Sequence, residues 1–183
     1  MKRILLVILA AALAPLAASA QQGAAPTAAP EANPVSSALR AIVARESREV
    51  VAGAEEMPED KYSYHPTPAQ MTFGHLVAHM ATFNFAMCST ISGVPAPKQD
   101  LTETDPKDKL VGALKGSFDF CTTSLANLDD SKLGEQLPFF GGRTASRATL
   151  MFVLAADFAD HYSTEASYLR LNGLLPPSAQ PRK

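Results

Sequence analysis

The sequence has no tryptophan, only two cysteines and no large excess of charge of either sign. Two cysteines are too few for a small scaffold held together by disulfides. A formal net charge of −2 over 183 residues argues against a nucleic-acid-binding protein, so we expect no nucleic-acid partner. The length suits one domain with tails, rather than several domains or a long repeat array.

Three sequence motifs of common catalytic sites are also missing. There is no G-x-S-x-G nucleophile elbow, no phosphate-binding P-loop and no C-x-x-C pair. The sequence therefore does not support a serine-nucleophile hydrolase, a P-loop nucleotide-binding enzyme or a thioredoxin-type redox protein. Any chemistry has to come from residues that the fold brings together.

Residues 1–20 have the pattern of a secretory signal peptide. Lys2 and Arg3 precede an apolar run over residues 4–17, and residues 18–20 form the small-x-small site that signal peptidase needs. The run is shorter than the ~20 residues of a membrane-spanning helix, so we favour cleavage over an uncleaved anchor. We therefore expect a periplasmic or secreted protein with no stable membrane anchor after cleavage.

The segments on either side of the expected domain have few large apolar residues. Residues 21–35 are rich in Ala and Pro, which predicts a disordered linker. Residues 178–183 are short and polar, which predicts a flexible tail. The folded domain is therefore expected over residues 36–177.

Within that domain, apolar residues recur at spacings of three and four, and no segment alternates with the period of a strand. This pattern predicts an all-α fold, a four-helix bundle. The predicted helices run from Ser36 or Ser37 to Met57, from Thr72 to Gly93, from Asp105 to Asp129, and from an N-cap at Ser146 to about Asn172.

Residues 131–145 are predicted to form a loop between the third and fourth helices. Its two phenylalanines, Phe139 and Phe140, could form a lid over a site, but we favour packing against the end of the bundle. Arg143 and Arg147 could bind an anionic substrate, but we expect both to be solvated.

The two cysteines, Cys88 and Cys121, fall on the second and third predicted helices. Export would place both in an oxidising compartment, where two thiols pair if the geometry allows. We favour a disulfide over the alternative of two buried free thiols.

Ionisable residues occur on helix faces that should be apolar. At 100° per residue, Asp157 and His161 fall within the apolar stripe of the fourth helix, and their spacing of four lets the side chains converge. On the second helix, His79 lies at the edge of the apolar stripe, whereas His75 is further out and is expected on the surface. Glu165 shares the stripe of the fourth helix, and we expect it to be a solvated flanking residue rather than a partner that orients a ligand.

His79, Asp157 and His161 together offer two imidazoles and a carboxylate. This donor set suits one divalent ion, with zinc first and nickel, iron or manganese as alternatives. Three protein ligands leave a coordination position open for water, as in catalytic metal sites. The alternative is that Asp157 and His161 form a structural hydrogen-bonded pair in a metal-free bundle.

The stretch 73–79, FGHLVAH, resembles the second-helix motif of the DinB-like superfamily of metalloenzymes. The resemblance to the fourth helix of its exported members lies in residues 160–162, 168–170 and Gly173 with 176–177. The resemblance to the segment before its second helix lies in residues 62–64 and 66–68. The resemblance covers residues 36–177. It implies a four-helix bundle whose metal is held by three histidines, one on the second helix and an H-x-x-x-H pair on the last. His79 and His161 match that pattern, and Asp157 stands in place of the first histidine of the pair.

Characterised members of this superfamily include thiol-dependent S-transferases and a maleylpyruvate isomerase, so the resemblance implies a low-molecular-weight thiol beside the metal. Two functions follow as hypotheses. The first is an exported metal-dependent protein that performs hydrolysis or thiol-linked transfer on a small molecule. The second is a metal-free helical bundle that binds a small ligand or a partner protein. The sequence leaves enzyme activity and formation of a dimer open.

Overall fold

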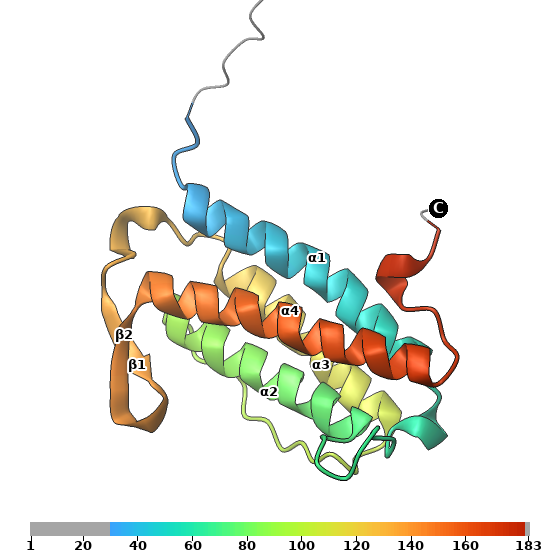
Figure 1. Ribbon diagram of the computed structural model, residues 1–183. Coiled ribbons are helices and arrows are strands. Elements are labelled where there is room, and N and C mark those ends of the chain that lie inside the picture. Colours follow the sequence, from blue (N-terminus) through green and yellow to red (C-terminus); the bar gives the residue numbers. More distant parts are fainter. Residues whose placement is uncertain (1–29, 182–183) are drawn as a thin grey trace, which may run out of the picture. The chain divides into compact units, whose positions relative to one another are not determined.

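Four long helices account for most of residues 30–181, the part of the chain that this computed structural model describes (Figure 1). They are α1 (Pro34–Glu56), α2 (Phe73–Ser92), α3 (Lys107–Ser124) and α4 (Arg147–Leu171). The predicted all-α four-helix bundle is therefore confirmed. The predicted signal peptide, 1–20, and most of the predicted linker, 21–35, lie outside the described residues. None of the helices within residues 30–181 combines the length and the hydrophobicity that a membrane-spanning helix needs.

The helices form two parallel pairs (Figure 1). α1 and α4 lie side by side and run in the same direction, whereas α2 and α3 run together in the opposite direction. Parallel neighbours cannot be joined by a tight turn, so the chain from α2 to α3 returns along the bundle as an extended segment, 93–106. We call this segment the strap. The arrangement places α2 against α4 in antiparallel orientation, which matters for the site below.

Two of the predicted helix starts are confirmed by their caps. The side chains of Thr72 and Ser146 accept hydrogen bonds from the backbone N–H groups of His75 and Thr149, as N-cap residues do. α3 begins at Lys107 with Pro106 as its N-cap, so the predicted cap at Asp105 is one residue too early. α3 also ends at Ser124, earlier than predicted.

The first helix begins at Pro34, before the predicted Ser36 or Ser37. Its cap comes from far along the chain: the carboxylate of Asp130 accepts hydrogen bonds from the backbone N–H groups of Val35 and Ser36, both at 2.9 Å. The Ser36 hydroxyl also donates to Asp130, at 2.6 Å. A carboxylate at a helix N-terminus binds the free N–H groups and the positive end of the helix dipole, so this contact ties α1 to the chain after α3.

One apolar core lies between the four helices, and the cysteine pair lies within it. Cys88 of α2 and Cys121 of α3 are both fully buried. Their Cα atoms are 5.2 Å apart and their sulfur atoms are at disulfide distance, as predicted. The disulfide joins the two parallel helices that the strap connects.

The segment between α3 and α4 is not the plain loop that was predicted. It contains a short antiparallel hairpin, β1 (Gln136–Phe139) and β2 (Arg143–Ser146), whose turn has Gly141 and Gly142 at φ values of 68° and 71°. Phe140 at the tip is 52% exposed, so the expectation that both phenylalanines pack down is wrong for Phe140.

The two arginines of this region differ in their surroundings. Arg143 is exposed, as expected, but Arg147 is only 7% exposed. Its guanidinium forms an ion pair with Glu135 at 2.6 Å, which explains how the charge is tolerated. The expectation that Arg147 is solvated is therefore wrong, and the residue fastens the start of α4 to the chain before the hairpin.

The chain after α4 folds back on the bundle. Pro177–Ala179 form a 3-10 turn, and the backbone N–H of Ser178 donates to the Tyr162 hydroxyl at 2.9 Å. The side-chain amide of Gln180 donates to Glu56 at 2.9 Å. The first residues of the predicted flexible tail, 178–183, are thus bonded to α1 and α4.

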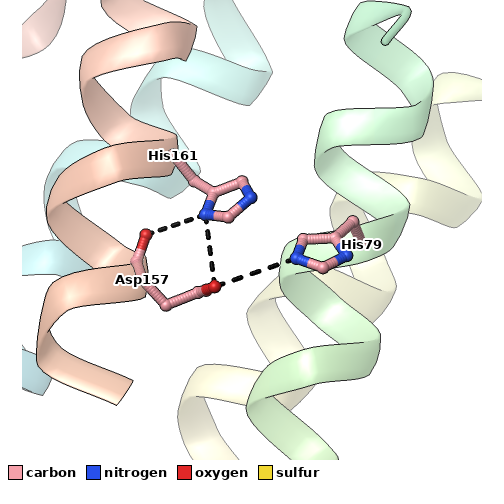
Figure 2. A group of neighbouring side chains, drawn as sticks. All are labelled: His79, Asp157 and His161. Atoms are coloured by element: carbon pink, nitrogen blue, oxygen red, sulfur yellow. Dashed lines mark hydrogen bonds and ion pairs between the residues drawn. The ribbon is translucent and has the colours of Figure 1, made fainter. Parts of the chain in front are cut away.

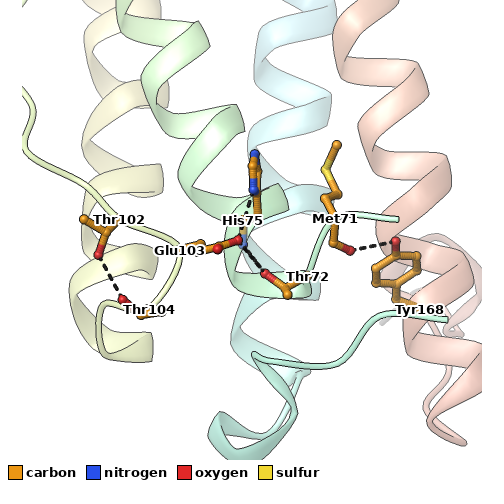
Figure 3. A network of polar contacts seen from close by, with 7 residues as sticks. All are labelled: Met71, Thr72, His75, Thr102, Glu103, Thr104 and Tyr168. Carbon is orange, nitrogen blue, oxygen red and sulfur yellow. Dashed lines mark hydrogen bonds and ion pairs between the residues drawn. The ribbon is translucent and has the colours of Figure 1, made fainter. Parts of the chain in front are cut away.

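The strap packs directly against the backbone at the start of α2 (Figure 3). Thr72 and His75 both contact the Glu103 carboxylate, at 3.2 Å and 3.1 Å, and His75 is half exposed, as predicted. On the other side, the Tyr168 hydroxyl of α4 donates to the Met71 carbonyl oxygen at 3.0 Å. A Cβ atom on Gly74 would lie 2.4 Å from the Glu103 carbonyl oxygen, so only glycine fits there.

We predict that Gly74→Ala destabilises the protein by about 1–3 kcal/mol, because the added methyl group must displace the backbone of the strap. Gly112→Ala is the matched control: a Cβ atom at this position inside α3 would meet no heavy atom within 4 Å, and alanine favours a helix by about 0.5–1 kcal/mol over glycine. Urea unfolding followed by circular dichroism measures both free energies of unfolding. Equal effects of the two substitutions would contradict the close packing of the strap.

Candidate metal centre

The three ionisable residues singled out in the sequence meet at the contact between α2 and α4 (Figure 2). His79 projects from α2, and Asp157 and His161 project from successive turns of α4. Each offers one ligand atom, and these atoms all lie within 4.8 Å of one another. The antiparallel packing of α2 on α4 thus brings together residues that are about 80 positions apart in sequence.

The Asp157 carboxylate lies between the two imidazoles. Its Oδ1 atom is 3.4 Å from His161 Nδ1 and 3.8 Å from His79 Nε2. His161 Nδ1 is closer still to the Asp157 backbone oxygen, at 2.8 Å. A carbonyl oxygen only accepts, so this bond assigns the proton of His161 to Nδ1 and leaves the lone pair on Nε2. Metal-binding histidines typically fix their tautomer in this way.

The site is partly open to solvent on one side. The side chains of Asp157 and His161 are 13% and 12% exposed, whereas that of His79 is 36% exposed. The imidazole rings of His79 and His161 stack with centroids 4.6 Å apart. The site is therefore most exposed on the His79 side, while the two residues of α4 are held inside the bundle.

One polar atom of the site has no hydrogen-bond partner among the described residues. Asp157 Oδ2 is buried and has no hydrogen-bond partner within residues 30–181. Burying a carboxylate oxygen without a partner costs several kcal/mol by the usual transfer estimates, about 1–3 kcal/mol when judged from mutations. A divalent cation would satisfy that oxygen, and two imidazoles with one carboxylate are a common ligand set for zinc. The residues therefore fit a metal ion.

Glu165, one turn after His161 on α4, is fully buried. Neither of its carboxyl oxygens has a partner among the described residues, and this burial raises the pKa of the carboxyl well above its ordinary value. A Cβ atom on Gly53 of α1 would come within 2.8 Å of the Glu165 carboxyl carbon, so the glycine makes room for it. The expectation of a solvated flanking residue is therefore wrong. Its position within the apolar stripe was the signal that could have identified it.

Comparison with known proteins agrees with this architecture. The family model described as the DinB superfamily matches residues 42–164, a range that contains all three residues of the site. A search of curated protein sequences finds no match.

Solved structures show the same fold at low sequence identity. A DinB-like protein from Bacillus subtilis is 22% identical, with a TM-score of 0.64, over 79% of this chain and 99% of that one. A DinB-like protein from Bacillus cereus is 14% identical, with a TM-score of 0.64, over 77% and 95% of the two chains. A mycothiol-dependent maleylpyruvate isomerase is 13% identical, with a TM-score of 0.57, over 70% of this chain and 59% of that one.

The buried carboxyl predicts a specific pH dependence of stability. Because the pKa of Glu165 is raised on folding, the folded state keeps a proton that the unfolded state loses above the ordinary pKa of 4.5. The contribution of this group to the free energy of unfolding therefore falls as the pH rises from 4.5 towards the raised pKa. We expect Glu165→Gln to remove that fall.

The measurement is urea unfolding of metal-free protein at several pH values. Glu59→Gln, at an exposed glutamate, is the control and should keep the wild-type pH profile. A Glu165→Gln profile that parallels the wild type across this range would show that the carboxyl is not held neutral in the fold.

Proposed function

This chain belongs to the DinB superfamily, and we propose that it binds one divalent metal ion through His79, Asp157 and His161. Members of the superfamily often bind metal. The observation that carries the proposal is the meeting of three donor atoms from two helices within 4.8 Å, with a buried Asp157 oxygen that has no partner among the described residues. Zinc is the ion that this donor set suits best, and nickel, iron and manganese are the alternatives.

Each residue has a distinct part in holding the ion. His79 brings its ligand nitrogen from α2 and closes the site across the helix contact. His161 would bind through Nε2, because its Nδ1–H is held by the Asp157 backbone oxygen at 2.8 Å. Asp157 supplies negative charge, which offsets part of the charge of a divalent cation.

The proposed reaction is hydrolysis or thiol-linked transfer on a small molecule. Such an ion, when bound, lowers the pKa of a coordinated water or thiol and so supplies a nucleophile near neutral pH. The protein contributes access from the half-exposed His79 side and a dry wall formed by the core behind α4. The fold shared with a protein described as a mycothiol-dependent isomerase supports a thiol as co-reactant.

We also propose that the protein works outside the cytoplasm. Residues 1–20 have the signal-peptide pattern, and the only two cysteines of the chain are paired across α2 and α3. A buried disulfide with no catalytic spacing is typical of exported proteins and rare in the cytosol.

A metal-free binding module is the second candidate. The observation that favours it is the contact of the Asp157 carboxylate with both histidines, at 3.4 Å and 3.8 Å, because these side chains can hold one another without an ion. The aspartate also replaces a histidine of the usual superfamily pattern. In this case the three residues would be a structural polar cluster, and the site would neither bind a metal ion nor catalyse a reaction.

Elemental analysis of the untagged mature protein distinguishes the two candidates. We expect close to one equivalent of divalent metal per chain, and a loss of at least tenfold in affinity for His79→Ala, Asp157→Ala and His161→Ala. Asp157→His should keep or tighten binding, since it restores the three-histidine set. His75→Ala is the matched control: it removes an imidazole one turn away on α2 that pairs with Glu103, and it should leave the metal content unchanged.

Two results would refute the metal site. One is the absence of metal even after incubation with zinc and nickel. The other is unchanged metal content in His79→Ala, which would place any bound ion elsewhere. In the metal-free candidate, Asp157→His would lower stability without creating metal binding.

A further inference from the structure

A continuous stack of rings leads from the metal centre to the tip of the hairpin. The His161 ring stacks on His79, at 4.6 Å between centroids and 26° between planes. His79 stacks on Phe83, at 5.6 Å and 25°. Phe83 in turn stacks on Phe140, at 5.9 Å and 25°. These near-parallel planes come from three separate elements, α4, α2 and the hairpin turn.

The stack follows one face of α2. His79, Phe83 and Met87 are spaced by four residues, so they lie above one another on successive turns of that helix. Beyond Phe140, the hairpin and α2 line an open surface pocket of about 180 Å³, whose walls are Ala86, Met87, Thr90, Pro138, Phe139 and Phe140. A cavity of roughly 150 Å³ with apolar walls can hold a benzene ring.

The hairpin turn is built to hold Phe140 in this place. Gly141 and Gly142 adopt positive φ values, which lets the chain reverse directly after the ring. Arg143 Nε donates to the Phe140 carbonyl oxygen at 3.2 Å, and its guanidinium lies 5.4 Å from the centre of the Phe139 ring. Phe140 nevertheless stays 52% exposed, so one part of the ring is free for another molecule.

We propose that Phe83 and Phe140 form the substrate wall of the metal centre, and that the substrate is a small molecule with a flat apolar group, such as an aryl ring, and a polar head. The flat group would stack on the exposed part of Phe140, and the head would reach the site from the half-exposed side of His79. Rings at these separations attract each other in offset stacks, and a substrate ring extends the same pattern. This inference rests on the proposed metal site.

A pair of metal-binding probes tests the wall. 6-Phenylhexanohydroxamic acid and heptanohydroxamic acid carry the same head on the same five-carbon linker and end in a phenyl or a methyl group. The linker is needed because Phe83 separates His79 from Phe140 in the stack. In zinc-loaded protein, calorimetry should show the phenyl probe binding at least tenfold more tightly than the methyl probe. Phe140→Ala should abolish most of that preference, and Phe140→Trp, which keeps a flat ring, should restore it.

The control is Phe152→Ala, which removes a ring of the same kind that is 68% exposed on α4, beside α1 and away from the stack. It should keep the full preference for the phenyl probe. Equal affinities of the two probes, or a preference that survives Phe140→Ala, would overturn the proposal while leaving the metal site intact.

A second experiment uses metal-free protein, so it tests the aryl-binding wall independently of the proposed metal site. In metal-free protein, the fluorine signal of 4-fluorobenzyl alcohol should broaden on binding to wild type and to Phe152→Ala, and not to Phe140→Ala. This result would support the aryl wall even if no ion binds to the three ligands. No broadening with properly folded wild type, or equal broadening with all three proteins, would overturn it.

Discussion

The position of α2 is the constraint on which the rest of this structure depends. Three contacts fix it at three levels along its length. At its start, Gly74 lies against the strap backbone with no room for a side chain. In its middle, His79 faces Asp157 and His161 of α4, and near its end Cys88 is joined to Cys121 of α3. Contacts to two different helices and to the strap fix both the rotation and the axial register of α2. The meeting of His79 with Asp157 and His161 requires both.

The same core contains buried carboxyl groups, and their desolvation opposes folding. Glu46, Asp157 and Glu165 each have at least one buried carboxyl oxygen without a partner among the described residues. Such oxygens oppose folding unless the group is neutral or meets a cation. Burial raises the pKa of Glu165 well above its ordinary value, which favours the neutral form of its carboxyl. The proposed metal ion would offer Asp157 the other solution, and it would link the stability of the α2–α4 contact to occupancy of the site.

The sequence predicts the features that depend on local spacing. The apolar stripes give four helices, Thr72 and Ser146 identify two starts, and the angular positions of Asp157 and His161 place both on the inner face of α4. Features that depend on contacts across the chain were missed. The Asp130 cap on α1 joins residues more than 90 positions apart, and no local pattern encodes it. The hairpin has strands of only four residues with Pro138 in one of them, too short for an alternating pattern to register. Glu165 was misjudged because glutamate is rarely buried, although its angle already pointed inward.

We propose that His79, Asp157 and His161 hold one divalent ion between α2 and α4. Anomalous diffraction at the zinc absorption edge, from crystals of the zinc-loaded protein, tests it most directly because it locates the ion among named atoms. We predict a single strong peak about 2.0–2.2 Å from one atom of each of the three side chains. A map without a peak there, or with its peak bound by other residues, would contradict it.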